Sequence, residues 1–200
     1  MNSIAIVVLA AGSAGRMGQP KQLLPWGDSS LLGHAVQTAL STADDTVFVV
    51  LGAYSDAIME QTDLSGTRVL VNANWQEGLG GSIALAVAVL DEKYPEIDAV
   101  LFTLADQPLI SASHLNAILQ LHLQEAHAIL ITRKEGYRGV PALFPRSYFS
   151  ELMLLSNDSG AKAVIDANPH EVREVVTADE TADIDTDAAY ESLFQLYPKI

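Results

Sequence analysis

The 200-residue sequence contains no cysteine. This absence excludes disulfides, thiolate catalysis, and zinc or iron–sulfur sites that cysteine would ligate. The sequence also lacks a long hydrophobic run near its start, because Ile4–Ala10 is far shorter than the ~20 residues of a membrane span. No basic region precedes this run, as one would in a signal peptide. We therefore expect a soluble, cytoplasmic protein that does not bind membranes and whose first apolar run is a buried strand.

Basic residues are scarce in this chain. It has 11 lysines and arginines against 25 aspartates and glutamates, a formal net charge of −14. Such a charge argues against nucleic-acid binding through a broad basic face. The segment from Met1 to Gly27 departs from the pattern, because it contains no acid and carries Arg16 and Lys21. This segment indicates an anion-binding site, although a buried strand and a short loop can also lack acids by chance.

Short runs rich in Val, Ile and Leu alternate with segments of helical periodicity. The runs are apolar throughout, which is typical of parallel strands covered by helices on both faces. The expected strands are Ile4–Ala10, Thr46–Gly52, Arg68–Asn72, Ala99–Leu104 and Ala128–Thr132, and the expected helices are Ser30–Ser41, Ser55–Thr62, Gly80–Glu92 and Ser111–Gln124. This order predicts an α/β three-layer sandwich with a mostly parallel, doubly wound sheet in a single domain.

The last part of the chain changes character. We expect helical stretches at Tyr148–Leu155 and Gly160–Ala167, a short strand at Glu174–Val176, an acidic loop and a helix at Thr186–Leu196. The single domain therefore has an elaborated C-terminal third. Ligands of open α/β sheets bind at the carboxyl ends of the strands, so functional residues are expected directly after strands.

The loop after the first expected strand is rich in glycine. Gly12, Gly15 and Gly18 allow backbone N–H groups to approach a phosphate, and Arg16 and Lys21 add positive charge. Two common phosphate loops are excluded. No Gly-Lys-Ser/Thr completes a Walker A motif, and the glycine spacing does not fit G-x-G-x-x-G.

A carboxylate follows the fourth expected strand, in the sequence A-D-Q-P at residues 105–108. Asp106 at a strand end is suited to hold Mg²⁺, which in turn bridges phosphates. The alternative is that Asp106 caps the next helix, but Ser111 is better placed for that role.

The segment Leu9–Pro25 follows the pattern L-A-A-G-x-S-x-R-M-G-x-x-K-x-L-L-P, with Ala14 where the pattern has serine. It resembles the nucleotidyltransferases of molybdenum cofactor biosynthesis, the MobA-like NTP transferases, and more broadly the sugar-nucleotide and cytidylyl transferases. The resemblance implies one nucleotidyltransferase domain, with a nucleotide-binding half at 1–110 and an acceptor-binding half at 111–200. It implies catalytic roles for Arg16, Lys21 and Asp106. The implied nucleotide-binding residues of this loop are Leu9, Ala10, Ala11, Gly12, Arg16 and Lys21.

The same resemblance implies that Asp106 and Asp185 bind one Mg²⁺ ion. Asp185 lies in A-D-I-D-T-D before the final helix, and the acids around it also fit a solvated, charged surface. A glycine cluster enters the third expected helix, where Gly78, Gly80 and Ser82 are implied to hold the base and ribose. The alternative for this cluster is a flexible loop.

Two later segments are implied to form the acceptor pocket. Residues 136–144 contain the family's G-x-P motif, and residues 157–162 resemble G-D-x-G-A-[RK]. Val140 stands where the family often has histidine, which leaves the identity of the acceptor open. The implied acceptor-binding residues are Arg138, Gly139, Pro141, Asp158 and Gly160.

The base is indicated by one residue of the first loop. In the family, L-A-A-G accompanies cytidylyl transfer and L-A-G-G accompanies guanylyl transfer, so Ala11 favours CTP. The implied reaction is Mg²⁺-dependent transfer of CMP from CTP to the phosphate of the molybdopterin cofactor, with release of pyrophosphate and a molybdoenzyme as the client. One alternative is a transferase that uses another nucleotide or a sugar or polyol phosphate. The other is a non-catalytic chaperone that delivers cofactor to a molybdoenzyme.

Overall fold

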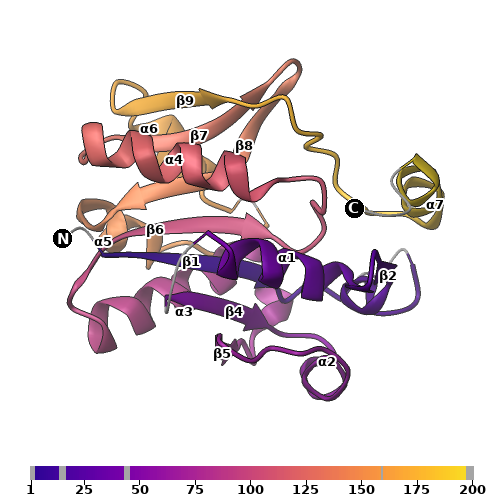
Figure 1. Cartoon of the computed structure of the whole chain (residues 1–200). Coiled ribbons are helices and arrows are strands. Elements are labelled where there is room, and N and C mark those ends of the chain that lie inside the picture. Colours follow the sequence, from indigo (N-terminus) through magenta and orange to yellow (C-terminus); the bar gives the residue numbers. More distant parts are fainter. Residues whose placement is uncertain (1–2, 14–16, 43–45, 159, 197–200) are drawn as a thin grey trace.

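The computed structural model describes residues 3–13, 17–42, 46–158 and 160–196. Its main feature is a seven-stranded sheet in the order β5-β4-β1-β6-β8-β7-β9 (Figure 1), beside a two-stranded ribbon, β2-β3. Among the described strands of the large sheet, only β8 runs antiparallel to its neighbours. The strands are β1 (Ser3–Ala10), β2 (Pro25–Trp26), β3 (Ser29–Ser30), β4 (Val47–Leu51), β5 (Arg68–Val71), β6 (Ile97–Leu104), β7 (Ile129–Lys134), β8 (Tyr137–Pro145) and β9 (Val172–Val176).

Helices connect the strands, and the expected strands and helices are all present. In the described part of the chain, no helix combines the length and the apolar character that crossing a membrane would require. The helices are α1 (Leu31–Leu40), α2 (Ser55–Gln61), α3 (Leu79–Lys93), α4 (Ala112–Gln124), α5 (Phe149–Leu152), α6 (Lys162–Ala167) and α7 (Asp187–Leu196), with the 3-10 turns η1 (Lys21–Leu23), η2 (Trp75–Glu77) and η3 (Arg146–Tyr148).

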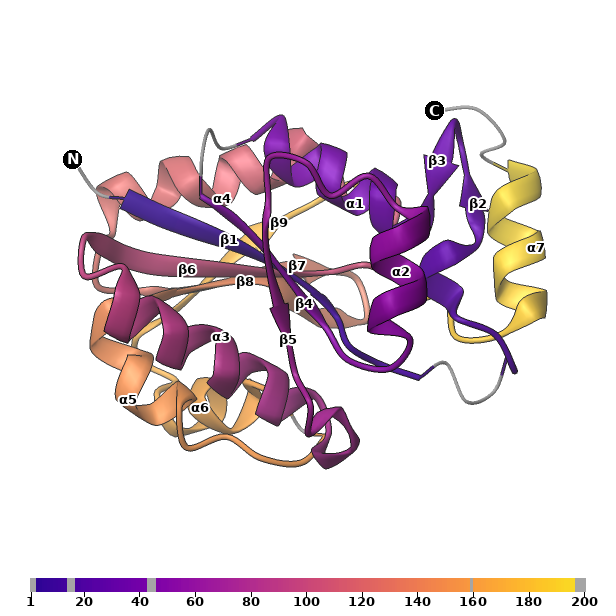
Figure 2. The ribbon, with the colours of Figure 1, turned by 90° about the horizontal axis from the view of Figure 1, so that it is seen from below.

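The sheet is buried on both faces, as the continuous apolar runs predict. In β1, Ala5 and Val7 belong to the core on one face, and Ile6 and Val8 belong to the core on the other. Helices α3, α5 and α6 cover the first face, whereas α1, α2 and α4 cover the second (Figure 2). The predicted three-layer, doubly wound fold is therefore confirmed. Since the chain winds from β1 to β4 and β5 and then crosses to β6, the strand order reverses between β1 and β6.

Two serines start helices where the sequence predicts. The Ser30 hydroxyl accepts a hydrogen bond from Gly33 N at 3.1 Å at the start of α1. The Ser111 hydroxyl accepts from His114 N at 3.2 Å at the start of α4. Asp106 is therefore not the cap of α4, and its carboxylate is available for another role.

Strand β8 is the main element that the sequence analysis did not predict. Gly139 and Pro141 interrupt its apolar pattern, and both residues are unfavourable in a central strand. The pairing of β7 with β8 shifts register beside Thr132, so Val140 and Pro141 bulge from the ladder. The carbonyl of Pro141 accepts a hydrogen bond from Thr132 Oγ1 at 2.7 Å. The bulge thus accommodates a residue that has no N–H to donate.

Helix α7 packs beside the β2-β3 ribbon, away from the large sheet (Figure 1). The contact includes a small third core, in which Trp26 lies in edge contact with Phe194 at a centroid distance of 6.0 Å. The Tyr190 hydroxyl donates to Pro25 O at 2.7 Å. The C-terminal segment is thereby attached to the region that follows the glycine-rich loop. The buried members of this core are Met17, Leu24, Trp26, Leu31 and Ile184.

Candidate active site

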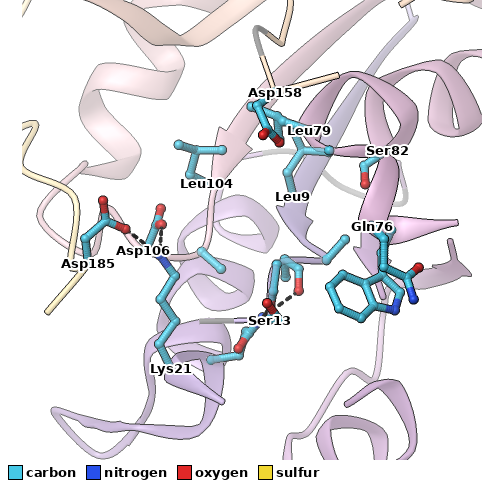
Figure 3. A pocket seen from close by; sticks show the side chains of 17 residues that line it. Leu9, Ser13, Lys21, Gln76, Leu79, Ser82, Leu104, Asp106, Asp158 and Asp185 are labelled. Carbon is cyan, nitrogen blue, oxygen red and sulfur yellow. Dashed lines mark hydrogen bonds and ion pairs between the residues drawn. The ribbon is translucent and has the colours of Figure 1, made fainter. Parts of the chain in front are cut away.

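A cleft of about 690 Å³ opens where the strand order reverses, at the carboxyl ends of β1 and β6. This is the place at which open α/β sheets bind ligands. Many of the residues that the sequence singles out meet here (Figure 3). The predicted nucleotide- and metal-binding residues that line the cleft are Leu9, Ala10, Ala11, Gly12, Lys21, Gly78, Ser82, Asp106 and Asp185.

Lys21, the first residue of η1, extends across the cleft toward two carboxylates. Its Nζ contacts Asp106 Oδ2 and lies 3.0 Å from Asp185 Oδ1 (Figure 3). Burial disfavours the charged ammonium, but attraction by Asp106 and the hydrogen bonds to both carboxylates outweigh it, so the pKa of Lys21 is raised. The cleft therefore holds a permanent cation at neutral pH.

One backbone hydrogen bond brings the two carboxylates together. Ile184 N donates to Asp106 O at 2.9 Å, and the Ile184 side chain is fully buried in the third core. The chain around Ile184 is thus fixed beside the end of β6, and its neighbour Asp185 reaches the cleft. The sequence alone does not show this meeting, because the two aspartates lie on separate segments.

The two carboxylates are suited to hold a divalent cation that also binds the phosphates of a ligand. Asp106 Oδ1 is buried and has no hydrogen-bond partner among the described residues. A buried oxygen of this kind requires a partner, and a carboxylate oxygen is a preferred ligand of Mg²⁺. In the described part of the chain, no group of three or more His, Cys, Asp or Glu residues is arranged to hold a metal. The protein therefore offers Asp106 and Asp185, and phosphate oxygens would complete the shell, as is common for Mg²⁺.

Gln22 holds together two segments that line the cleft, and the sequence analysis did not predict this role. This side chain is 2% exposed. Its Nε2 donates to Ala10 O at 2.8 Å and to Gly12 O at 2.7 Å, which ties the end of β1 to η1. Because Gln22 directly follows Lys21 in the sequence, its position could have indicated that it belongs to the site. The predicted catalytic residue Arg16 lies outside the described residues, so its role stays a prediction.

The glycine cluster before α3 packs closely against another loop. Gly78 has a φ of +97°, and a Cβ there would lie 2.6 Å from the carbonyl carbon of Asn157. Gly80 N donates to Asn157 O at 2.8 Å. Ser82, which lines the cleft, accepts from Asn72 Nδ2 at 3.0 Å. Gly80 is not among the residues that line the cleft, so its visible role is to let α3 approach the Asn157 loop.

A second cavity, of about 480 Å³, adjoins the cleft and shares the side chains of Leu9, Leu79 and Leu104 with it. It lies on the sheet face that α3 and α6 cover, beside the bulge of β8. Most of its wall is apolar. The other apolar side chains of this wall are Ile83, Phe102, Ile131, Val140, Ala142, Phe144 and Ile165, with Ala161.

The predicted acceptor-binding residues do not all meet in this cavity. Asp158 lines the first cleft instead, and Pro141 is buried in the bulge and lines neither space. Arg138 Nε pairs with Glu174 Oε1 at 3.0 Å near the surface. Lys162 also lines the cavity, at an exposed position. The predicted residues that do line it are Arg138, Gly139 and Gly160.

A buried polar network forms one wall of the second cavity, and the sequence analysis did not assign it a function. Gln107, which is 3% exposed, directs its Nε2 at Asp183 Oδ1 (2.7 Å), the Tyr137 hydroxyl (3.1 Å) and Thr181 O (3.3 Å). The Tyr137 hydroxyl donates to Val140 O at 2.7 Å. The network thus links β6, β8 and the segment that carries Asp185.

The polar atoms of this network are suited to bind a ligand. Gln107 Oε1 is buried and has no partner among the described residues. Burial and repulsion by Asp106 raise the pKa of the Asp183 carboxyl, and burial raises the pKa of the Tyr137 hydroxyl. Two signals could have identified these residues: Gln107 follows Asp106 directly, and Asp183 belongs to the same acidic segment as Asp185.

Known proteins resemble this chain over nearly its whole length. Nicotine blue oxidoreductase of Paenarthrobacter nicotinovorans is 29% identical over 197 residues, which cover 95% of this chain and 94% of that protein. The crystal structure of Rv0371c from Mycobacterium tuberculosis H37Rv is 31% identical with a TM-score of 0.86, and the match covers 97% of this chain and 98% of that one. A structure of the same protein in complex with manganese is 30% identical with a TM-score of 0.81, at the same coverage.

The match to a protein family covers most of the chain and most of the residues that line the two cavities. Residues 6–172 match the MobA-like NTP transferase domain. This range contains Lys21, Asp106 and β8, whereas Asp185 lies beyond it. The resemblance of the Leu9–Pro25 loop to this family is therefore confirmed over residues 6–172. The chain belongs to the MobA-like NTP transferase family and is a nucleotidyltransferase.

Proposed function

We propose that this nucleotidyltransferase transfers CMP from CTP to the phosphate of the molybdopterin cofactor, for use by a client molybdoenzyme. The observation that carries the proposal is the junction of two unlike spaces. One is a cleft with Lys21, Asp106 and Asp185, and the other is an apolar cavity with a polar wall. A triphosphate suits the first space, and a flat heterocycle suits the second.

The lining of the second cavity supports a pterin as the acceptor over a sugar or polyol phosphate. A polyol carries many hydroxyl groups, and each one buried without a partner costs ~1–3 kcal/mol. The apolar wall offers few such partners. A pterin would place its flat faces against side chains such as Phe102 and Phe144, with its polar edge at Gln107 and Tyr137. Val140 fits this arrangement as an apolar wall residue in place of histidine.

Ala11, in the L-A-A-G pattern of the first loop, supports CTP as the donor. Ala11 and Trp75 both line the cleft and both lie against Gly52. A Cβ added to Gly52 would lie 2.9 Å from Ala11 Cβ and 2.5 Å from Trp75 Cβ. Gly52 itself does not line the cleft, so these distances show how Ala11 is packed and do not measure the room for a base. The preference for a one-ring base over a purine rests on the L-A-A-G pattern, in which a methyl group at Ala11 would narrow the base site.

The proposed reaction is a substitution at the α-phosphorus. A phosphate oxygen of the acceptor forms a bond to this phosphorus, the bond to the bridging oxygen of the β-phosphate breaks, and pyrophosphate leaves with the electron pair. The phosphate nucleophile is already ionised, so the site requires little general-base assistance. Lys21, and Arg16 by its predicted role, would align the phosphates and neutralise their charge. Asp106 and Asp185 would hold Mg²⁺, which would supply further charge neutralisation at the phosphates.

A pyrophosphate-release screen tests the proposal. Purified protein is combined with molybdopterin cofactor, Mg²⁺ and each of CTP, GTP, ATP and UTP. We expect the fastest release with CTP. Faster release with GTP would overturn the assignment of the base, and release only with sugar or polyol phosphates would overturn the acceptor.

A second assay separates the enzyme from a non-catalytic chaperone. Asp106→Asn should abolish pyrophosphate release and, with it, the reconstitution of a client molybdoenzyme that requires the cytidylylated cofactor. A chaperone that only carries cofactor would reconstitute the client equally well with either protein.

A further inference from the structure

Lys21 binds the same carboxylates that are proposed to hold the metal. Its ammonium lies between Asp106 and Asp185, in contact with Asp106 Oδ2 and 3.0 Å from Asp185 Oδ1 (Figure 3). The side chains of Lys21 and Asp106 are only 15% and 18% exposed, so solvent screens this contact weakly. The ammonium is thus a built-in cation at the junction of the two carboxylates.

A divalent cation bridging these carboxylates would require the same oxygens. Mg²⁺ and Mn²⁺ bind carboxylate oxygens at about 2.0–2.2 Å, closer than an ammonium approaches them. The metal and the ammonium would therefore occupy overlapping space and repel each other strongly in a partly buried site. Both cannot occupy the position between Asp106 and Asp185 at the same time.

The displaced ammonium requires a new anionic partner. Lys21 has a flexible four-carbon side chain and stands at the end of the glycine-rich loop, and both Lys21 and Gly12 of this loop line the cleft. A triphosphate in this cleft would supply such a partner, whereas a bare metal ion would leave the ammonium without one. Departure of Lys21 is therefore favourable with nucleotide and unfavourable without it.

We propose that Lys21 and the divalent cation bind Asp106 and Asp185 alternately, so that nucleotide must draw Lys21 away before the metal binds tightly. Lys21 then sets the order of assembly: it keeps bare metal out and makes metal and nucleotide bind cooperatively. By linkage, each of the two ligands raises the affinity for the other by the same factor. This inference rests on the proposed function for the identity of the metal ligands.

The alternative is that Lys21 is a fixed clamp, meaning that its ammonium stays in place and holds the two carboxylates together. The two views predict opposite signs for one measurement. If Lys21 is a clamp, its removal separates Asp106 from Asp185 and weakens metal binding. If Lys21 is a competitor, its removal frees both carboxylates and strengthens metal binding.

The experiment measures Mn²⁺ binding directly, from the loss of the free-ion signal in electron paramagnetic resonance, with no nucleotide present. We expect Lys21→Met to bind Mn²⁺ about tenfold more tightly than the unaltered protein. Lys21→Arg, which keeps a cation there, should stay weak. Lys93→Met, an exposed site at the end of α3, makes the same charge change far from the cleft and should have no effect.

A repeat with a CTP analogue that has a methylene group between its α- and β-phosphorus atoms tests the coupling. A blank without protein corrects for Mn²⁺ that the analogue binds by itself. After this correction, the analogue should tighten Mn²⁺ binding to the unaltered protein far more than to Lys21→Met. Lys21→Met leaves two like charges together and can lower the Tm of the metal-free protein. The rise in Tm on adding Mn²⁺ is therefore measured for each protein against its own metal-free Tm, as a second readout of metal binding.

Each outcome separates this inference from the proposed function. Equal or weaker Mn²⁺ binding by Lys21→Met would overturn the competition and leave the nucleotidyltransferase reaction in place. Absence of Mn²⁺ binding by both proteins, with and without the analogue, would overturn the metal site itself and the inference with it.

Discussion

Replacing Asp106 by asparagine changes one atom at the centre of the cleft and leaves the fold around it intact. The hydrogen bond from Ile184 N is made to the backbone oxygen of residue 106, so Asp185 keeps its place. Asparagine keeps one side-chain oxygen and puts an N–H donor where the other stood. Oδ2 contacts Lys21, and Oδ1 has no partner among the described residues. One orientation of the amide therefore disrupts the Lys21 contact, and the other removes the oxygen proposed to bind Mg²⁺.

The expected loss of activity is large. Loss of a single preorganised charge-stabilising group typically lowers kcat by about 10²–10³, or ~2.7–4 kcal/mol. We expect a decrease of at least this size in pyrophosphate release with CTP and molybdopterin cofactor. The loss of stability should be smaller than this, because Lys21 keeps Asp185 as a partner at 3.0 Å.

Asp98→Asn is the matched control, because it makes the same change on the same strand at an exposed position near the opposite end. This variant should retain full activity. Urea unfolding of all three proteins checks that folding is comparable. If Asp106→Asn kept most of its activity at saturating Mg²⁺, the carboxylate would not be a metal ligand, and the proposed mechanism would be wrong.

Three further predictions follow from the site and the core. Ala11→Gly should shift the ratio of kcat/KM for CTP and GTP about tenfold toward GTP, and an unchanged ratio would show that the methyl group does not exclude purines. Gln107→Leu removes the donor to Asp183 and the unpaired Oε1, so the KM for the acceptor should rise about tenfold while the KM for CTP stays constant. Burial lowers the pKa of His114 and His122. Because these folded-state pKa values are depressed, the stabilisation is complete above about pH 6.5 and decreases as the pH falls below it. Urea unfolding at stepped pH measures this, and His122→Leu should flatten the dependence.

The layers of the fold could be predicted because local pattern and burial agree. Strands such as β1 and β4 are apolar on both faces, and Ser30 and Ser111 mark helix starts by local hydrogen bonds. Strand β8 could not be predicted in this way. Its bulge makes room for Gly139 and Pro141, and a bulge depends on pairing with a neighbouring strand rather than on local sequence.

The site could be predicted from strand ends and from the family resemblance, which also implied Gly78, Ser82 and Asp185. Asp106 comes directly after β6, so its place at the cleft follows from the fold class. Lys21 stands at the far end of the loop that follows β1, and the loop motif indicated its place. The positions of the remaining site residues depend on contacts between segments that are distant in sequence. Asp158 reached the nucleotide side because its loop packs on Gly78, and Gln107 joined the second cavity because its partners come from β8 and the C-terminal segment.

The attachment of Ile184 to Asp106 has a consequence for the growing chain during synthesis. Every described strand of the large sheet lies before Thr177, so the sheet can assemble before the segment with Ile184 and Asp185 has been translated. Asp185 emerges only after that, and its carboxylate reaches the cleft when Ile184 enters the small core beside Trp26. A folding intermediate with a finished sheet would therefore still lack one of the two carboxylates. Its capacity to bind metal and nucleotide together would arise only once this segment has packed beside Trp26.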